Sequence, residues 1–241
     1  MATADFINKI TLGDSYELIK QLDDNSVDAI YTDIPYLFES GTTNSSDLGV
    51  RKQRQQKELN YIRQGIDYSI LDEFMRVMKK PNIFIWCSKK QVPDILDYFI
   101  KKDCLFEILV WCKTNPIPTG CQTWLPDIEY CLYFRESGVR LNDGYELKSR
   151  WYVSDINKRD KDKFMHPTIK PLDLVERHLK HTTQEGDIIL DAFMGSGTTA
   201  VACKSTGRNF IGFEIEKQWW EIANDRINGV DAYGQQSFIL Y

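Results

Sequence analysis

The chain has 241 residues, 42% of them hydrophobic and 12% aromatic, with a formal net charge of −5. This composition is typical of a globular protein with a sizeable core and excludes a disordered chain. No apolar run approaches the ~20 residues of a membrane span. The first residues, MATADFINKITLGD, carry acids and lack the apolar stretch of a secretory signal, so we expect a cytoplasmic protein without membrane contact.

Cysteine and histidine residues do not indicate a metal centre. The six cysteines form no CxxC pair, and the three histidines are too few and too poorly spaced to ligate a metal. We therefore expect reduced cysteines, mostly in the core, and no bound metal.

Segments with strand and helix character alternate along the chain. In chain order we expect a strand over 10–14, a helix over 15–22, a strand over 26–33, a helix over 68–80, a strand over 81–88, a helix over 91–102, strands over 105–113 and 127–137, a helix over 171–182, a strand over 187–193, a helix over 198–207, a strand over 209–215 and a helix over 218–227. Strands that alternate with such helices indicate an α/β fold with a doubly wound, mostly parallel sheet, here of seven strands.

Two polar segments, 37–65 and 138–165, interrupt this alternation and contain clusters of basic residues. We interpret both as insertions in a single domain that spans residues 1–241. Charge clusters of this kind are commonly solvated surface, and they indicate phosphate contacts only if the rest of the chain points to nucleic acid.

The stretch YTDIPY, residues 31–36, ends an apolar strand. Asp and Pro are common turn formers, and Pro often ends a strand because it cannot donate a ladder hydrogen bond. Taken alone, the stretch is explained as a strand end. A carboxylate, a proline and a tyrosine at the mouth of a buried strand can also carry chemistry, and the rest of the chain must decide.

A second unusual stretch is DIILDAFMGSGTTAVAC. A buried strand ends at Asp191, Gly195 and Gly197 allow a tight turn, and Thr198 or Thr199 can cap the helix that follows. A strand, a glycine turn and a helix N-terminus together form a pocket of backbone N–H groups that suits an anion.

The pattern around this turn narrows the ligand. It is not GxxxxGK[ST], so a phosphate-binding P-loop is not indicated. Glu214 follows Asp191 at roughly the 20-residue spacing at which a carboxylate meets ribose hydroxyls in nucleotide-binding α/β folds. These features fit a nucleoside cofactor with a small anionic arm, such as the carboxylate of S-adenosylmethionine.

Together with HPTIKPLDLVERHL at 166–179, these two stretches resemble the β-class amino-methyltransferases of DNA. Members of that class transfer a methyl group from S-adenosylmethionine to the exocyclic amine of adenine or cytosine. Their Asp-Pro-Pro-Tyr motif precedes the glycine-rich motif, a circular permutation that this sequence shares. The resemblance covers essentially the whole chain. It implies a circularly permuted, Rossmann-like methyltransferase sheet, S-adenosylmethionine as cofactor and double-stranded DNA as substrate.

The resemblance also implies roles for the matching residues. Asp33 and the backbone carbonyl of Pro35 would accept hydrogen bonds from the target amine, and Tyr36 would stack on the flipped base. Glu214 would hold the ribose hydroxyls, and Asp14 would face the cofactor's adenine. The other residues expected at the cofactor are Asp33, His166, Thr168, Lys170, Asp191, Phe193, Gly195, Gly197 and Thr198.

If the substrate is DNA, the two polar segments become candidate DNA contacts, and 138–165 lies where this class carries its target-recognition region. A recognition region this short implies a short site or help from a second subunit, so a homodimer is a candidate assembly, as is pairing with a restriction endonuclease. The expected DNA-binding residues are Arg51, Lys52, Arg54, Arg150, Trp151, Lys158 and Arg159.

One position departs from the family pattern, because Ile34 stands where the motif has proline. Isoleucine frees a φ angle that proline would fix, which bears on the stiffness of the loop. In this family, Asp at position 33 favours adenine over cytosine as target. A cytosine-N4 enzyme, an RNA amino-methyltransferase, an inactive DNA-binding relative and a nicotinamide-dependent oxidoreductase remain alternatives.

Overall fold

The computed structural model describes residues 2–37, 65–116, 124–156 and 169–229. These residues form one eight-stranded sheet in the order β1-β8-β7-β2-β3-β5-β4-β6. The strands are β1 (Lys9–Leu12), β2 (Ala29–Asp33), β3 (Asn82–Cys87), β4 (Leu105–Lys113), β5 (Ile128–Arg135), β6 (Trp151–Ser154), β7 (Ile188–Asp191) and β8 (Asn209–Glu214).

Most of the strand pairs are parallel, which confirms the predicted α/β class. Strand β5 is the exception, because it runs antiparallel to both β3 and β4. The predicted number of seven strands is corrected to eight. The additional strand, β6, lies within 138–165 and pairs parallel to β4 at the edge of the sheet. Its four residues are flanked by polar sequence and show too little alternation to be recognised as a strand.

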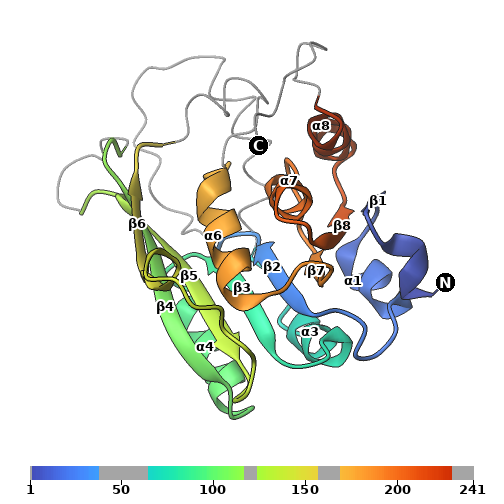
Figure 1. Cartoon of the computed structure of the whole chain (residues 1–241), viewed down its shortest axis with the longest axis horizontal. Helices are drawn as coiled ribbons and strands as arrows, with labels where there is room; N and C mark the ends of the chain where they lie inside the picture. Colours follow the sequence, from blue (N-terminus) through green and yellow to red (C-terminus); the bar gives the residue numbers. More distant parts are fainter. Residues whose placement is uncertain (1, 38–64, 117–123, 157–168, 230–241) are drawn as a thin grey trace.

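Helices cover both faces of the sheet (Figure 1). They are α1 (Ser15–Leu18), α3 (Ile70–Val77), α4 (Val92–Ile100), α6 (Leu172–Thr182), α7 (Thr198–Ser205) and α8 (Lys217–Ile227), with short 3-10 turns η1 (Thr3–Phe6), η2 (Ile19–Gln21) and η3 (Glu146–Lys148).

Strand β3 shows how the two cores are separated. All six of its residues are buried, as expected for a strand covered on both faces. Ile83 and Ile85 belong to the core that includes α3 and α4, whereas Phe84 and Trp86 belong to the core that includes α6 and α7. The alternation of side chains along one strand thus joins two helical layers to a single sheet.

The position of β2 and β7 sets the site. These strands are adjacent and parallel although the motifs that end them are far apart in the sequence. From this pair the chain continues to β3 on one side and to β8 on the other. A reversal of strand order of this kind opens a crevice beyond the carboxyl ends of the strands, where α/β proteins bind ligands.

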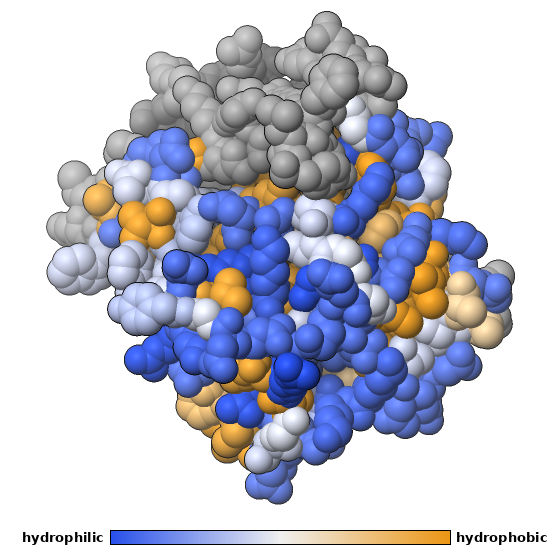
Figure 2. All heavy atoms as spheres, in the orientation of Figure 1, coloured by the Kyte–Doolittle hydropathy of each residue, from blue (hydrophilic) through white to orange (hydrophobic). Residues whose placement is uncertain are grey.

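Figure 2 shows one face of the molecule, on which hydrophilic residues predominate. None of the helices in the described ranges combines the length and the apolarity needed to cross a membrane.

Candidate functional site

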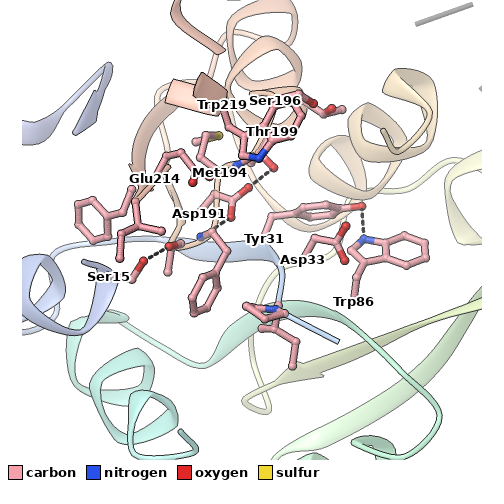
Figure 3. Close-up of a pocket in the computed structure, with 18 of the residues that line it drawn as sticks. Ser15, Tyr31, Asp33, Trp86, Asp191, Met194, Ser196, Thr199, Glu214 and Trp219 are labelled. Atoms are coloured by element: carbon pink, nitrogen blue, oxygen red, sulfur yellow. Dashed lines mark hydrogen bonds between the residues drawn. The ribbon is translucent and has the colours of Figure 1, made fainter. Parts of the chain in front are cut away.

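A cavity of about 200 Å³ opens at the carboxyl ends of β1, β2, β7 and β8, where the two sequence motifs meet (Figure 3). Asp33 lies on the side of Tyr31 and Trp86, and Glu214 lies on the other side, beyond Asp191. The predicted residues that line it are Asp14, Asp33, Pro35, Tyr36, Lys170, Asp191, Phe193, Gly195, Thr198 and Glu214.

Asp33 is the last residue of β2, and its two carboxylate oxygens have different surroundings. Oδ2 accepts a hydrogen bond of 2.5 Å from Nζ of Lys170, which lies just before α6. Oδ1 is buried and has no hydrogen-bond partner among the described residues. Burial raises the pKa of the Asp33 carboxyl, and the Lys170 ammonium opposes that shift. Among the described residues, Asp33 therefore presents one acceptor oxygen that no other group uses.

Lys170 also contacts a second carboxylate, that of Glu129 on β5, at 3.0 Å. Glu129 in turn pairs with Lys113 at the end of β4, at 2.6 Å. Burial alone would raise the pKa of Glu129, but the two lysines lower it to about 2. Burial alone would lower the pKa of Lys170, because it disfavours the charged ammonium. The nearby carboxylates of Asp33 and Glu129 reverse this effect and raise the pKa above its usual value. We call Lys113, Glu129, Lys170 and Asp33 the charge chain.

The Tyr36 side chain lies against this charge chain. Its hydroxyl donates to Oε2 of Glu129 at 3.4 Å and accepts from Nζ of Lys170 at 3.3 Å. The Lys170 ammonium also lies 5.6 Å from the Tyr36 ring centroid and 5.0 Å from that of Trp86. Tyr36 is thus held in place by polar contacts at its hydroxyl, and the residue lines the cavity.

The backbone of the loop after β2 is held by Gln91, a residue that the sequence did not single out. Gln91 is only 1% exposed and precedes α4. Its Nε2 donates to the carbonyl of Pro35 at 2.9 Å, and its Oε1 accepts from the backbone N–H of Leu37 at 3.3 Å. A carbonyl oxygen has two lone pairs, so Pro35 can accept one further hydrogen bond.

Ile34 compensates for the missing proline in two ways. Its backbone N–H donates to the carbonyl of Trp86 at 3.2 Å, a bond that proline cannot make. Its side chain is 1% exposed and belongs to the core of α3 and α4. The loop is therefore tied to β3 by a hydrogen bond and a buried side chain instead of by a fixed φ angle.

The wall beneath Asp33 is a buried aromatic group. Trp86 Nε1 donates to the Tyr31 hydroxyl at 3.0 Å, and that hydroxyl lies 3.2 Å from Nδ1 of His178. Burial lowers the pKa of His178 to about 3, so its ring is neutral. Neutral His178 can accept a hydrogen bond from the Tyr31 hydroxyl, which leaves this wall hydrogen-bonded and uncharged.

Asp191 lies behind the glycine loop and holds it. Its carboxylate accepts from the hydroxyls of Thr32 at 3.0 Å and Thr199 at 2.6 Å, and from the N–H of Phe193 at 3.1 Å. Burial raises the pKa of Asp191 to about 7 in spite of these bonds. The hydroxyl of Thr199 is therefore used to fix Asp191 and does not cap α7.

The glycine turn differs from the anion pocket predicted for it. The N–H of Gly195 donates to Oε2 of Glu214 at 2.7 Å, and that of Gly197 donates to the carbonyl of Met194 at 3.0 Å. Gly197 precedes α7 with φ of 82°, and a Cβ there would lie 3.0 Å from the Cβ of Ala223. The turn requires glycine because of this conformation and contact, and it uses one N–H to orient Glu214.

Three further contacts complete the part of the cavity that contains Glu214. The second Glu214 oxygen accepts from the N–H of Glu216 at 2.8 Å. Buried Arg226 on α8 donates to the Thr198 hydroxyl at 2.9 Å, so Thr198 does not cap α7 either. Asp14 caps α1 by accepting from the N–H of Tyr16 at 2.9 Å, and it borders the cavity.

The predicted DNA contacts are only partly described. Arg150 pairs with Glu107 of β4 at 3.2 Å, and Trp151 begins β6 with 60% of its surface exposed. Both lie at the edge of the sheet. The predicted site residues outside the described ranges are Arg51, Lys52, Arg54, Lys158, Arg159, His166 and Thr168.

Sequence reasoning missed Gln91, Lys113, Glu129 and Arg226. Glu129 had a detectable signal, because a glutamate within the apolar run DIEYCLYF is unusual in a buried strand. The other three looked like ordinary polar residues near the ends of elements.

Comparison with known proteins identifies the family of this chain. The model of a family described as DNA methylase matches residues 27–225. The type II methyltransferase M2.LlaDCHI of Lactococcus lactis subsp. cremoris is 32% identical over 240 residues, which cover 92% of this chain and 89% of that protein. M2.DpnII of Streptococcus pneumoniae, also a type II methyltransferase, is 32% identical over 244 residues, 91% of this chain and 90% of that protein.

A solved structure shares the fold over nearly the same length. The crystal structure of an M1.HpyAVI–SAM complex is 27% identical, with a TM-score of 0.67, and the match covers 94% of this chain and 100% of that one. From the family match over most of the chain and from these relatives, we conclude that the protein belongs to the DNA methylase family and is a DNA methyltransferase.

Proposed function

We propose that the protein transfers a methyl group from S-adenosylmethionine to the exocyclic N6 amine of an adenine flipped out of double-stranded DNA. The observation that carries this proposal is the unused buried acceptor Oδ1 of Asp33, in the same cavity as the Glu214 carboxylate. One half of the cavity can receive an amine, and the other can receive a ribose.

The residues of the second half fit S-adenosylmethionine. Glu214 is fixed by the backbone N–H groups of Gly195 and Glu216, so its carboxylate is oriented before any ribose hydroxyl arrives. Asp14 offers a further acceptor, and Phe193 and Trp219 add aromatic surface for a purine. When bound, S-adenosylmethionine supplies a methyl group on a sulfonium, which is a good electrophile.

The task left to the protein is to make the amine a better nucleophile. The lone pair of an aromatic amine is delocalised into the ring. Oδ1 of Asp33 and the second lone pair of the Pro35 carbonyl accept hydrogen bonds from the two N–H groups of the amine, which favours a tetrahedral nitrogen with a localised lone pair. These acceptors also stabilise the positive charge that develops on nitrogen during transfer. Because they are fixed in advance, they supply part of the orientation on which the rate depends.

The target base must leave the duplex to reach this acceptor pair. A paired and stacked adenine keeps its amine inside the helix, so the enzyme has to flip it out. The ring of Tyr36 borders the cavity next to Asp33 and is held at its hydroxyl, which suits a surface for stacking. Asp33 in the motif supports adenine as the target.

The test measures product rather than binding. Purified protein is incubated with labelled S-adenosylmethionine and either duplex DNA or RNA, and the nucleic acid is digested to nucleosides. We expect label in N6-methyladenine from DNA. Label in N4-methylcytosine would show that the target base is cytosine and not adenine. Label in RNA alone would refute the proposal. Transfer to neither would favour a DNA-binding relative without activity.

We further propose a cytoplasmic enzyme that acts as a homodimer in a restriction-modification pair, with Arg150, Trp151 and the basic residues of 37–65 and 138–165 at the DNA. The support is the name of the relatives, type II methyltransferases, and the short segment available for recognition.

Sedimentation with and without duplex DNA tests the dimer. Expression in a host that lacks adenine methylation, followed by mapping of modified positions, gives the recognition sequence, and protection from a cognate endonuclease tests the pairing.

A further inference from the structure

We propose that Glu129 is a positioning residue for methyl transfer: it shares Lys170 with Asp33, so that the lysine stays on Oδ2 and leaves Oδ1 open to the target amine. Lys113 assists by holding Glu129. This inference rests on the proposed function and adds two residues, on β4 and β5, that lie outside the motifs of the catalytic and cofactor loops.

The geometry of the charge chain carries the inference. Lys170 contacts Asp33 Oδ2 at 2.5 Å and Glu129 Oε2 at 3.0 Å, so the ammonium lies between the two carboxylates. The other Glu129 oxygen is engaged by Lys113 at 2.6 Å. The side chain of Lys170 is 7% exposed, and those of Glu129 and Lys113 are 18% and 15% exposed. Contacts this short between mostly buried ions are specific and directional.

The charge chain is not explained by a contribution to stability alone. Each buried ion loses hydration worth several kcal/mol, and well-packed apolar residues are often as stable in the same place. The four charges alternate in sign and sum to zero, which makes their burial tolerable without making it advantageous. Three of the four residues, Asp33, Glu129 and Lys170, line the cavity, and this favours a role in the reaction.

Without Glu129, nothing in the charge chain would hold Lys170 away from Oδ1. A lysine side chain has four rotatable bonds and a compact charge that can bind either oxygen of one carboxylate. If Lys170 bridged both Asp33 oxygens, the ammonium would occupy the acceptor that the amine needs. Glu129 pulls the ammonium to the opposite side, where it also meets the Tyr36 hydroxyl at 3.3 Å.

The pH dependence of the reaction reports on this arrangement. Asp33 must be ionised to accept from the amine, so the acid limb of the rate follows its pKa. The Glu129 charge raises that pKa, whereas the Lys170 charge lowers it. Within the described ranges, the titratable or charged groups that face Asp33 are Tyr31, Tyr36, Cys87, Glu129, Cys131, Lys170 and Asp191.

The experiment compares single-turnover methylation of duplex DNA by the wild type, Glu129→Gln and Lys113→Met across the acid range. Glu136→Gln is the matched control, because Glu136 follows the far end of the same strand and is exposed. For Glu129→Gln we expect a fall of about 10- to 100-fold in rate, the effect of losing one charged hydrogen bond in the transition state. The Kd for S-adenosylmethionine is expected to stay nearly constant.

The two variants should move the acid limb in opposite directions. Removing the negative charge of Glu129 lowers the pKa of Asp33, so the limb shifts to lower pH. Removing the positive charge of Lys113 leaves Glu129 uncompensated and draws Lys170 toward it, so the limb shifts to higher pH. A residue that only supports the fold would change the melting temperature without this reversal of sign.

The outcomes are separable. If the wild type methylates no DNA, the proposed function fails and this inference fails with it. If the wild type is active and Glu129→Gln keeps the wild-type rate and pH profile, only the role of Glu129 is refuted. Should Glu129→Gln not fold, Lys113→Met decides alone, because an acid limb that does not move to higher pH contradicts the shared position of Lys170.

Discussion

Replacing Ile34 by proline restores the usual family motif and, in this protein, should destabilise the fold. Proline cannot donate the hydrogen bond from residue 34 to the Trp86 carbonyl, which is 3.2 Å long here. It also replaces a side chain that is 1% exposed in the core of α3 and α4. The family residue is thus expected to be the worse choice in this context.

The magnitude follows from three contributions. An unsatisfied buried carbonyl costs about 1–3 kcal/mol of folding free energy. The smaller apolar side chain loses about 0.8 kcal/mol, the value of one buried methylene. Proline stabilises the folded state by about 0.4–1 kcal/mol, because it restricts the conformations of the unfolded chain. We therefore expect Ile34→Pro to lower the free energy of unfolding by about 2 kcal/mol, or about 4–8 °C in Tm for a chain of this size.

Ile34→Val is the matched control, since it removes one methylene and keeps the N–H. Its expected loss is about 1 kcal/mol. Both variants are compared with the wild type by chemical denaturation and by thermal melting, in the same buffer and without cofactor. If the proline variant is as stable as the valine variant, the hydrogen bond to Trp86 does not contribute and our account of Ile34 is wrong.

Three further predictions concern the site. Asp33→Ala should abolish methyl transfer while calorimetry shows S-adenosylmethionine binding nearly unchanged, and a variant that still methylates DNA would rule out the proposed acceptor. Gln91→Leu should lower the single-turnover rate about tenfold by releasing the Pro35 carbonyl, and a wild-type rate in that variant would show that the clamp is dispensable. Burial raises the pKa of Asp191 to about 7, so the folded state binds a proton that the unfolded state releases above about pH 4, and the contribution of Asp191 to wild-type stability should fall between about pH 4 and pH 7 by up to about 4 kcal/mol and then level off. Asp191→Asn should remove that contribution, so the difference in unfolding free energy between the wild type and the variant should change with pH over this range in denaturation series, and a difference that is constant with pH would contradict the assignment.

The family could be predicted because its motifs are local in the sequence. Asp33, Pro35 and Tyr36 are near neighbours, and Asp191, Gly195 and Gly197 lie on one turn, so each group is visible as a short string. The alternation of strands and helices predicted the α/β class from periodicity alone, and the order of the motifs predicted the permuted arrangement. Among the strands of the described sheet, only the four-residue edge strand β6 was not predicted, because its pattern is too short to stand out.

What only the tertiary structure decided is which groups meet. Lys170 and Asp33 are 137 residues apart, and Gln91 and Pro35 are 56 apart. No local pattern marks such pairs, because they arise where strands and loops from distant parts of the chain end at one edge of the sheet. The motif YTDIPY, together with the two downstream motifs, therefore predicted the family from sequence. The fold determined which Asp33 oxygen has no partner among the described residues, how Ile34 replaces a proline, and that Lys170 joins Asp33 to Glu129 and Lys113, since charge contacts depend on distance in space and not along the chain.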